Sequence, residues 1–221
     1  MVDSPILLPA SWQRPVAVVA VFGGLGALGL GWRYAGMRTA GPLDRAVGSW
    51  FGGPDSPHEP LLWALSIPGS PPGLLLGLII LVSWAVRTRR GSAVVLAVVG
   101  PLSAVLLTEF VLKPIIDRTH DGTPALPSGH ATSIAAQAAV YFLAFAASGR
   151  PGNRWLRRVL GAAAGLAVIG VSVGMVGPDR HYATDTVAGV LVGASVVSAL
   201  ALALNSWATR RLSQPPVRAR R

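Results

Sequence analysis

The feature that most constrains the fold of this chain is a series of long apolar runs that contain hardly any charge. A helix needs about 20 predominantly apolar residues to cross the hydrocarbon core of a bilayer. Six runs approach that length, and they are residues 16–32, 71–86, 92–112, 131–147, 159–176 and 184–208. The sequence therefore predicts an all-α fold, a polytopic membrane bundle with six transmembrane helices.

Two apolar stretches need separate interpretation. Residues 60–69 are too short to span and end at the breaker pair Pro68-Gly69, so we expect an interfacial or re-entrant segment there. The first long run follows Arg14 and could be a signal peptide, but no small-residue cleavage motif follows it, which favours a retained helix. The predicted organisation is an N-terminal segment (1–15), a membrane domain (16–208) and a basic tail (209–221).

The charges are few, and their placement predicts the topology. Only 13% of the residues are charged, yet the formal net charge is +10. If both termini lie on one side, that side holds thirteen arginines and the other side holds six cations. The positive-inside rule then places both termini in the cytoplasm, with the basic tail against anionic lipid headgroups. This arrangement makes nucleic acid an unexpected partner, and the absence of cysteine excludes disulfides and thiolate metal sites.

The same topology brings three polar segments to the opposite membrane face. Lys113, the single lysine of the chain, ends the third expected span. His130 begins the fourth, and His181 stands just before the sixth. We therefore expect these segments to converge on the extracytoplasmic side.

The segment that opens the fourth span favours an anion site. Ser128 is a good N-cap, and Gly129 allows the backbone to approach a ligand closely. The free N–H groups and the dipole of a helix start favour a phosphate-like anion, which would lie beside His130. The alternative is a plain helix cap with an interfacial histidine.

The segment before the sixth span predicts an oriented histidine. His181 and Asp185 are four residues apart, so they share a face if the turn is helical. Asp185 could then accept a hydrogen bond from one imidazole nitrogen and leave the other free as a nucleophile. The alternatives are a structural His–Asp pair and a metal site, although a metal would need further ligands and the nearby cations oppose it.

The end of the third span predicts a held cation. Glu109 precedes Lys113 by four residues, and an acid inside a span is usually paired. We expect Glu109 to hold Lys113 upright, with Arg118 five residues further on. The alternative is a lysine that snorkels to the interface and binds nothing.

Taken in order, these segments resemble the three-motif signature of the type 2 phosphatidic acid phosphatase superfamily, the membrane lipid phosphate phosphatases. The matching pieces are a lysine followed by an arginine, then Pro-Ser-Gly-His at residues 127–130, then His181 with Asp185. The resemblance covers roughly residues 60–200. It implies metal-independent hydrolysis of a phosphomonoester or diphosphate through a phosphohistidine, with no cofactor.

The chain departs from the family pattern at two arginines. The arginine of the first motif falls on His120, with Arg118 two positions earlier. The Ser-Arg pair of the third motif falls on Gly174 and Met175, while Arg180 stands directly before His181. Whether Arg118 and Arg180 replace the family arginines is left open.

The resemblance assigns a role to each candidate residue. His181 would be the nucleophile, oriented by Asp185, and His130 would be the general acid. The phosphoryl oxygens would be held by Lys113, Arg118, Ser128, Gly129 and Arg180, with Glu109 and His120 in support.

The expected substrate is a lipid phosphate, because the site lies at the external edge of the plasma membrane. Polyprenyl diphosphate, phosphatidic acid and phosphatidylglycerol phosphate all fit, and an isoprenoid carrier is favoured. The main alternative is a non-catalytic lipid-phosphate binder or transporter that reuses the fold. A vanadate-dependent haloperoxidase has a similar site, but six spans argue against it. The oligomeric state is not predicted.

Overall fold

A computed structural model describes residues 7–51, 57–146 and 154–213, and 81% of these residues are helical. The prediction of a nearly all-α fold is therefore confirmed. Residues 1–6 of the expected N-terminal segment, residue 147 of the fourth expected span and residues 214–221 of the basic tail lie outside the described residues.

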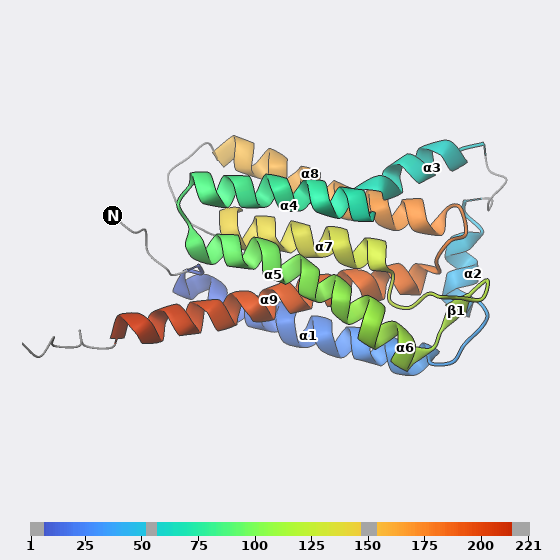
Figure 1. Ribbon diagram of the computed structural model, residues 1–221. Coiled ribbons are helices and arrows are strands. Elements are labelled where there is room, and N and C mark those ends of the chain that lie inside the picture. The colour runs from blue at the N-terminus through green and yellow to red at the C-terminus, as the bar shows by residue number, and fades with distance from the viewer. Residues whose placement is uncertain (1–6, 52–56, 147–153, 214–221) are drawn as a thin grey trace, which may run out of the picture.

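Each expected span is helical. The long helices are α1 (Ala10–Tyr34), α4 (Pro71–Arg87), α5 (Gly91–Leu107), α7 (Gly129–Tyr141), α8 (Arg154–Val176) and α9 (Ala183–Ser213). They run up and down along one bundle, so that α1 begins and α9 ends at the same end (Figure 1). The side of the membrane on which that end lies stays a prediction.

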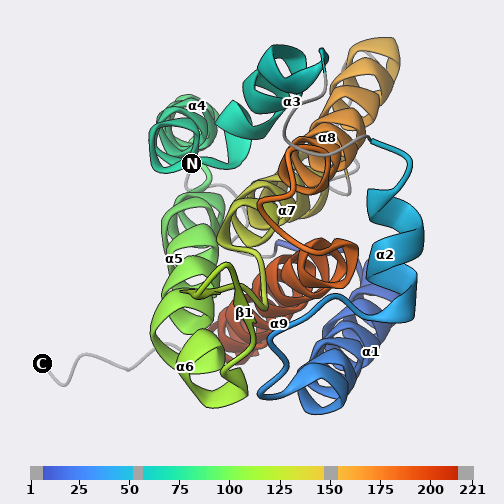
Figure 2. The same ribbon diagram turned by 90° about the vertical axis from the view of Figure 1, so that its right-hand side faces the viewer.

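Shorter elements extend or connect these helices. They are α2 (Pro42–Gly48), α3 (Glu59–Ser66), the 3₁₀ turn η1 (Ile67–Gly69), the π-helical η2 (Thr108–Leu112), α6 (Lys113–Ile116), the hairpin strands β1 (Thr119–His120) and β2 (Thr123–Pro124), and the π-helical η3 (Phe142–Ala146). The strands pair antiparallel, with His120 opposite Thr123. Viewed from the opposite end of the bundle, α2 and the β hairpin lie near the start of α9 (Figure 2).

The predicted number of six membrane crossings is not confirmed. Within the described residues, four helical segments are long and apolar enough to span: Ala10–Tyr34, Gly91–Ile116, Arg154–Val176 and Ala183–Arg211. Glu59–Gly69 and Pro71–Arg87 add a fifth if this pair, bent by 47°, counts as one span. The expected span 131–147 is not among these segments, because the α-helical part of α7 is only 13 residues long.

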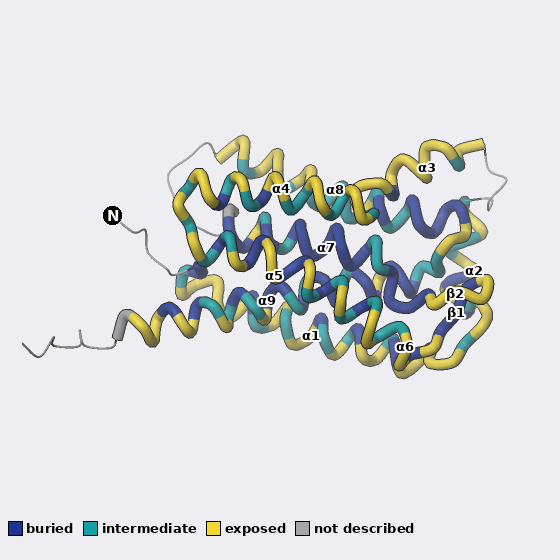
Figure 3. Tube along the Cα trace, in the orientation of Figure 1, coloured by how far each residue is buried: buried dark blue, intermediate teal, exposed yellow. Residues whose placement is uncertain are grey.

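The burial pattern of the bundle is that of a protein surrounded by lipid. Large apolar side chains face outward, such as Phe22 of α1 (67% exposed) and Leu166 of α8 (68% exposed). Polar side chains are buried inside, among them Thr132 and Gln137 of the central helix α7. Figure 3 shows α7 almost wholly buried between helices that carry exposed stripes. This distribution follows from the solvent. Lipid tails are as apolar as the side chains, so burying apolar side chains inside the bundle gains no hydrophobic free energy.

Two glycines bring the start of α9 against the start of α7. A Cβ atom on Gly189 would lie 2.5 Å from the carbonyl oxygen of Ser128, and one on Gly193 would lie 2.5 Å from that of Thr132. The Ser128 N–H donates to the carbonyl oxygen of Asp185 over 2.9 Å. Small residues permit this backbone contact, and it fixes the two predicted site segments relative to each other.

The short segment expected at 60–69 is the pair α3 and η1. Helix α3 packs on α8 so closely that a Cβ atom on Gly174 would overlap the carbonyl oxygen of Leu62. A Cβ atom on Gly69 would lie 2.6 Å from the carbonyl oxygen of His130. The segment therefore supports the start of α7 from the α8 side.

Candidate active site

The cap that opens α7 has the predicted form. Ser128 is fully buried, and its Oγ accepts a long hydrogen bond of 3.5 Å from the N–H of Ala131. His130 follows in the first turn and is half-buried. The N–H groups of this turn are the ones that can meet an anion.

The predicted pair of Glu109 and Lys113 lies against this cap. The Nζ atom of Lys113 is 2.8 Å from Oε2 of Glu109, and the lysine side chain is only 14% exposed. Gly129 packs on the pair, since an added Cβ atom would overlap Oε1 of Glu109 and lie 3.9 Å from Nζ of Lys113. The glycine thus brings the ammonium group next to the backbone at the start of α7.

His181 and Asp185 lie together at the start of α9. Nδ1 of His181 is 3.5 Å from Oδ2 of Asp185, and the histidine side chain is 11% exposed while the aspartate is fully buried. The second role of Oδ2 is to accept the N–H of Tyr182 over 3.0 Å. Nδ1 is buried and forms no hydrogen bond with the described residues, so the carboxylate of Asp185 is the charged group next to it.

The two histidines and the nearby cations influence one another. Burial lowers the pKa of His130, and its electrostatic interactions with His181, Lys113 and Arg180 lower it further. The carboxylate of Glu109 acts in the opposite direction, but the net direction is downward. These surroundings therefore favour the neutral form of the His130 imidazole.

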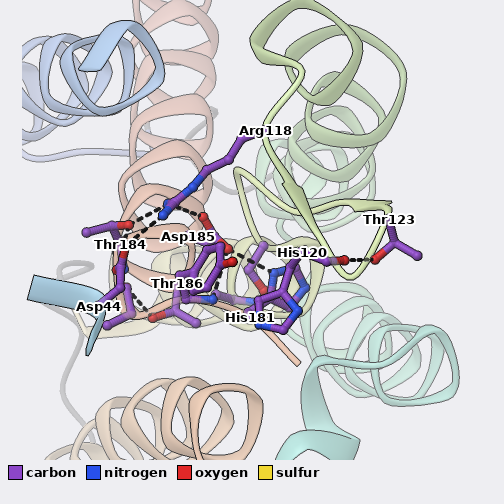
Figure 4. A network of polar contacts seen from close by, with 12 residues as sticks. Asp44, Arg118, His120, Thr123, His181, Thr184, Asp185 and Thr186 are labelled. Atoms are coloured by element: carbon purple, nitrogen blue, oxygen red, sulfur yellow. Dashed lines mark hydrogen bonds and ion pairs between the residues drawn. The ribbon is translucent and has the colours of Figure 1, made fainter. Parts of the chain in front are cut away.

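Arg118 lies elsewhere than predicted. Its side chain is fully buried; Nη1 donates to Oγ1 of Thr184 and to Oδ1 of Asp185, and Nη2 donates to Oδ2 of Asp44, each over 2.6 Å (Figure 4). The guanidinium also lies over the rings of Tyr34 and Tyr182, 4.3 and 4.4 Å from their centroids. These contacts leave its Nη donors directed at the protein, whereas the sequence suggested an arginine that faces a phosphate.

Asp44 completes this network from α2. Its Oδ1 accepts both the N–H and the hydroxyl of Thr184, and its Oδ2 accepts the N–H of Gly41 besides Arg118. Burial by itself raises the pKa of this carboxyl, but the hydrogen bonds from Thr184 and Arg118 outweigh it and lower the pKa. Asp44 is thus an ionised group inside the protein.

His120 and Arg180 occupy different surroundings. His120 is buried, with Nε2 3.1 Å from Oδ1 of Asp179 and its ring 4.4 Å from that of Tyr182. Arg180 is exposed, and its backbone N–H donates to the carbonyl oxygen of Met175. His120 therefore braces the loop before α9, while the Arg180 side chain is free to turn toward an anion.

The structure thus brings together most of the predicted residues, and it adds some that sequence reasoning missed. His130, His181, Asp185, Lys113, Glu109, Ser128 and Gly129 gather where α7 and α9 begin. The missed residues are Tyr34, Asp44, Tyr182 and Thr184, which surround Arg118. No local pattern marks them, because only tertiary contacts bury Asp44 next to an arginine.

Fold and site together define a helical membrane protein with a cluster of histidines, cations and buried carboxylates at one end of its bundle. Comparison with family models gives a match to the PAP2 superfamily over residues 95–209, which is more than half of the chain. The chain belongs to the PAP2 superfamily, as the motifs predicted. Membership suggests a phosphatase-type function and a lipid phosphate substrate. The same comparisons found no matching curated protein and no matching solved structure.

Proposed function

We propose that this protein is an integral-membrane lipid phosphate phosphatase that works through a phosphohistidine. The observation that carries the proposal is the meeting of His130, His181 with Asp185, and Lys113 at the starts of α7 and α9. Family membership supplies the reaction class. The reaction is hydrolysis of a phosphomonoester or diphosphate of a lipid.

In the first step, Nε2 of His181 attacks phosphorus and the bond to the leaving oxygen breaks. Asp185 faces Nδ1 of the same ring, so it favours the tautomer with the proton on Nδ1 and stabilises the positive charge that develops on the imidazole. His130, protonated when the anionic substrate is bound, gives its proton to the leaving oxygen. The products of this step are a phosphohistidine and the lipid with one phosphoryl group fewer.

In the second step, water attacks the phosphohistidine. His130 is now neutral and takes a proton from that water, which regenerates its acid form. The bond between phosphorus and Nε2 breaks, and inorganic phosphate leaves. Both steps depend mainly on the positioning and charge stabilisation of the phosphoryl group.

We assign the phosphoryl oxygens to Lys113, Arg180, the Gly129 N–H and the Ser128 hydroxyl. Lys113 supports this role because Glu109 holds it beside Gly129. Arg180 is exposed and its charge reaches His130. These cations supply the positive charge that a metal provides in other phosphatases, so we propose metal-independent catalysis. Arg118 is left out, because its Nη donors point to Asp44, Thr184 and Asp185.

We place the site on the extracytoplasmic face of the plasma membrane. The support is the charge distribution, since most arginines belong to the end of the bundle opposite the site. A lipid phosphate can reach a site at this edge from the bilayer. An isoprenoid carrier such as a polyprenyl diphosphate suits external dephosphorylation, and phosphatidic acid and phosphatidylglycerol phosphate are the other candidates.

The test is a phosphate-release assay with the purified full chain in detergent micelles, screened across lipid monophosphates and diphosphates. His181→Ala is expected to abolish release, while EDTA leaves it unchanged. Arg180→Ala is expected to lose much more activity than Arg45→Ala, whose guanidinium donates to the carbonyl oxygen of Ala40. Full activity in His181→Ala would refute the mechanism, and equal effects of the two arginine variants would remove Arg180 from the site.

A second candidate function is a non-catalytic lipid-phosphate binder or transporter. It is favoured by the two missing motif arginines, whose positions hold other residues. His120, at the first, contacts Asp179, and Met175, at the second, is a buried apolar residue. It is opposed by the retained His130, His181 and Asp185. Binding of a lipid phosphate without any release of phosphate would favour this alternative.

A further inference from the structure

The contacts of Arg118 form a closed network behind the proposed nucleophile. Arg118 bonds to Asp185 and Asp44 directly, and Thr184 bridges Arg118 to Asp44 through its hydroxyl. All three charged side chains are fully buried. Burying charges is unfavourable unless each is paired and hydrogen-bonded, and removing one member leaves the others uncompensated. A network of this kind fixes the positions of its members.

Among the side-chain contacts that the structure describes, Asp185 is the member of the network that faces the His181 ring. Oδ1 of Asp185 is held by Arg118 over 2.6 Å, and Oδ2 is held by the N–H of Tyr182 over 3.0 Å. With both oxygens held, the carboxylate cannot rotate, and Oδ2 stays 3.5 Å from Nδ1 of His181. The orientation of the imidazole therefore depends on a guanidinium that does not touch it.

We infer that Arg118 and Asp44 are positioning residues for the proposed hydrolysis, acting through Asp185 on His181, and that Arg118 is not a phosphate ligand. This inference rests on the proposed function. It gives a reaction role to an α2 residue that no motif marks, and a new role to an arginine that the sequence assigned to the substrate.

Charge explains why the network needs two carboxylates. Arg118 next to Asp185 alone would form a neutral pair, which favours a positive charge on the adjacent imidazole less than a cluster with a net negative charge does. Asp44 restores one net negative charge to the cluster of Asp44, Arg118 and Asp185. Within this buried site, that charge stabilises the imidazolium-like ring that forms when Nε2 of His181 bonds to phosphorus. Asp44 thus contributes charge, while Arg118 contributes geometry.

The network around Arg118 combines residues inside the family match with residues before it. Asp44 of α2 and Tyr34, which stacks on the guanidinium, both lie before residue 95, where the match begins. Arg118, Thr184 and Asp185 lie within it. Residues that precede the family match therefore complete the network behind His181.

The experiment measures kcat, KM and inhibition by inorganic phosphate for two conservative variants of the full chain, with the lipid phosphate that the wild type hydrolyses fastest. Arg118→Lys keeps the charge but loses the two-armed geometry, and Asp44→Asn keeps the shape but loses the charge. Each is expected to lower kcat by on the order of 10- to 100-fold, as misplacement of a reacting group does. KM and the inhibition constant for phosphate should stay near wild type. Lys113→Ala, as a phosphate-site variant, should raise both.

Arg38→Ala is the matched control. Arg38 lies at the same end of the bundle and pairs with Asp117 over 2.8 Å, but both side chains are about 60% exposed. Its loss should leave kcat and KM unchanged. Thermal unfolding monitored by circular dichroism identifies any variant that does not fold. If Arg118→Lys does not fold, Asp44→Asn, which retains the side-chain volume, still tests the inference.

Two results would overturn the inference. The first is a wild-type kcat in both Arg118→Lys and Asp44→Asn. The second is a phosphate inhibition constant that rises in Arg118→Lys as it does in Lys113→Ala, while kcat of Arg118→Lys stays at the wild-type value. His181→Ala separates this failure from that of the proposed function. If His181→Ala is inactive and the two network variants are fully active, only the positioning role is wrong. If His181→Ala is fully active, the phosphohistidine mechanism itself is wrong.

Discussion

The contact between the starts of α7 and α9 makes Gly189→Ala a sensitive test of the site geometry. The new Cβ atom would lie 2.5 Å from the carbonyl oxygen of Ser128, and ordinary contact begins at 3.4 Å. The Cβ atom is fixed rigidly to the α9 backbone and the oxygen belongs to the backbone at the start of α7, so the helices must move apart by about 0.9 Å. His181 and Asp185 belong to the start of α9, and His130 belongs to α7. The substitution therefore changes the separation between nucleophile and acid.

A displacement near 1 Å can reduce the rate of a positioned reaction by about 100-fold, or about 2.7 kcal/mol of transition-state stabilisation. Overpacking of this kind destabilises a fold by about 1–3 kcal/mol, so we expect a folded protein with a lowered melting temperature. The assay is phosphate release from a lipid phosphate, with kcat and the unfolding midpoint measured on the same preparation.

Gly165→Ala is the control for this substitution. Gly165 lies inside α8, and an added Cβ atom would have no neighbour within 4 Å. Alanine is the better helix former by about 0.5–1 kcal/mol, so activity should be unchanged and stability equal or slightly higher. Wild-type kcat in Gly189→Ala would refute the reasoning, because it would mean that the spacing of α7 and α9 does not set the distance between the two histidines.

Three further predictions concern the residues around His130. Because burial and nearby positive charge lower the pKa of His130 below its ordinary 6.5, its acid form is lost as the pH rises, and kcat/KM should fall along a basic limb that lies below 6.5. In Lys113→Met one of these positive charges is gone, so the pKa of His130 should rise and the limb should move to higher pH; an unmoved limb would exclude His130 as the acid. Gly129→Ala should displace the Glu109 carboxylate and raise KM at least as much as Lys113→Met does. Steady-state kinetics on the full chain would show this increase. An unchanged KM would mean that Lys113 does not need Glu109 to bind the substrate.

The sequence located the helices well because apolar length is a local property. The expected span 71–86 is α4 (Pro71–Arg87), and the expected span 159–176 ends where α8 (Arg154–Val176) ends. The number of crossings was harder to predict, since α7 is short and packed inside the bundle. Whether such a helix crosses a membrane depends on its neighbours as well as on its own hydropathy.

The candidate site likewise has a part that the local sequence predicts and a part that only tertiary contacts create. Local sequence was enough to predict Ser128, Gly129 and His130, because they are adjacent in the chain. It was also enough to predict the pair of His181 and Asp185, because these residues are one helical turn apart. Arg118 also stood out as a cation near a motif. Its partner Asp44 is 74 residues away in sequence, and no pattern in either neighbourhood could indicate that the two would be buried together.

The network around Arg118 also has a consequence for the order of assembly. Its guanidinium needs Asp44, which is made early, and Asp185, which belongs to the last helix of the chain. Until α9 docks, the arginine has only one of its two carboxylate partners, and full burial at that stage would leave it poorly compensated. Docking of α9 therefore supplies the second carboxylate on which the full burial of Arg118 depends.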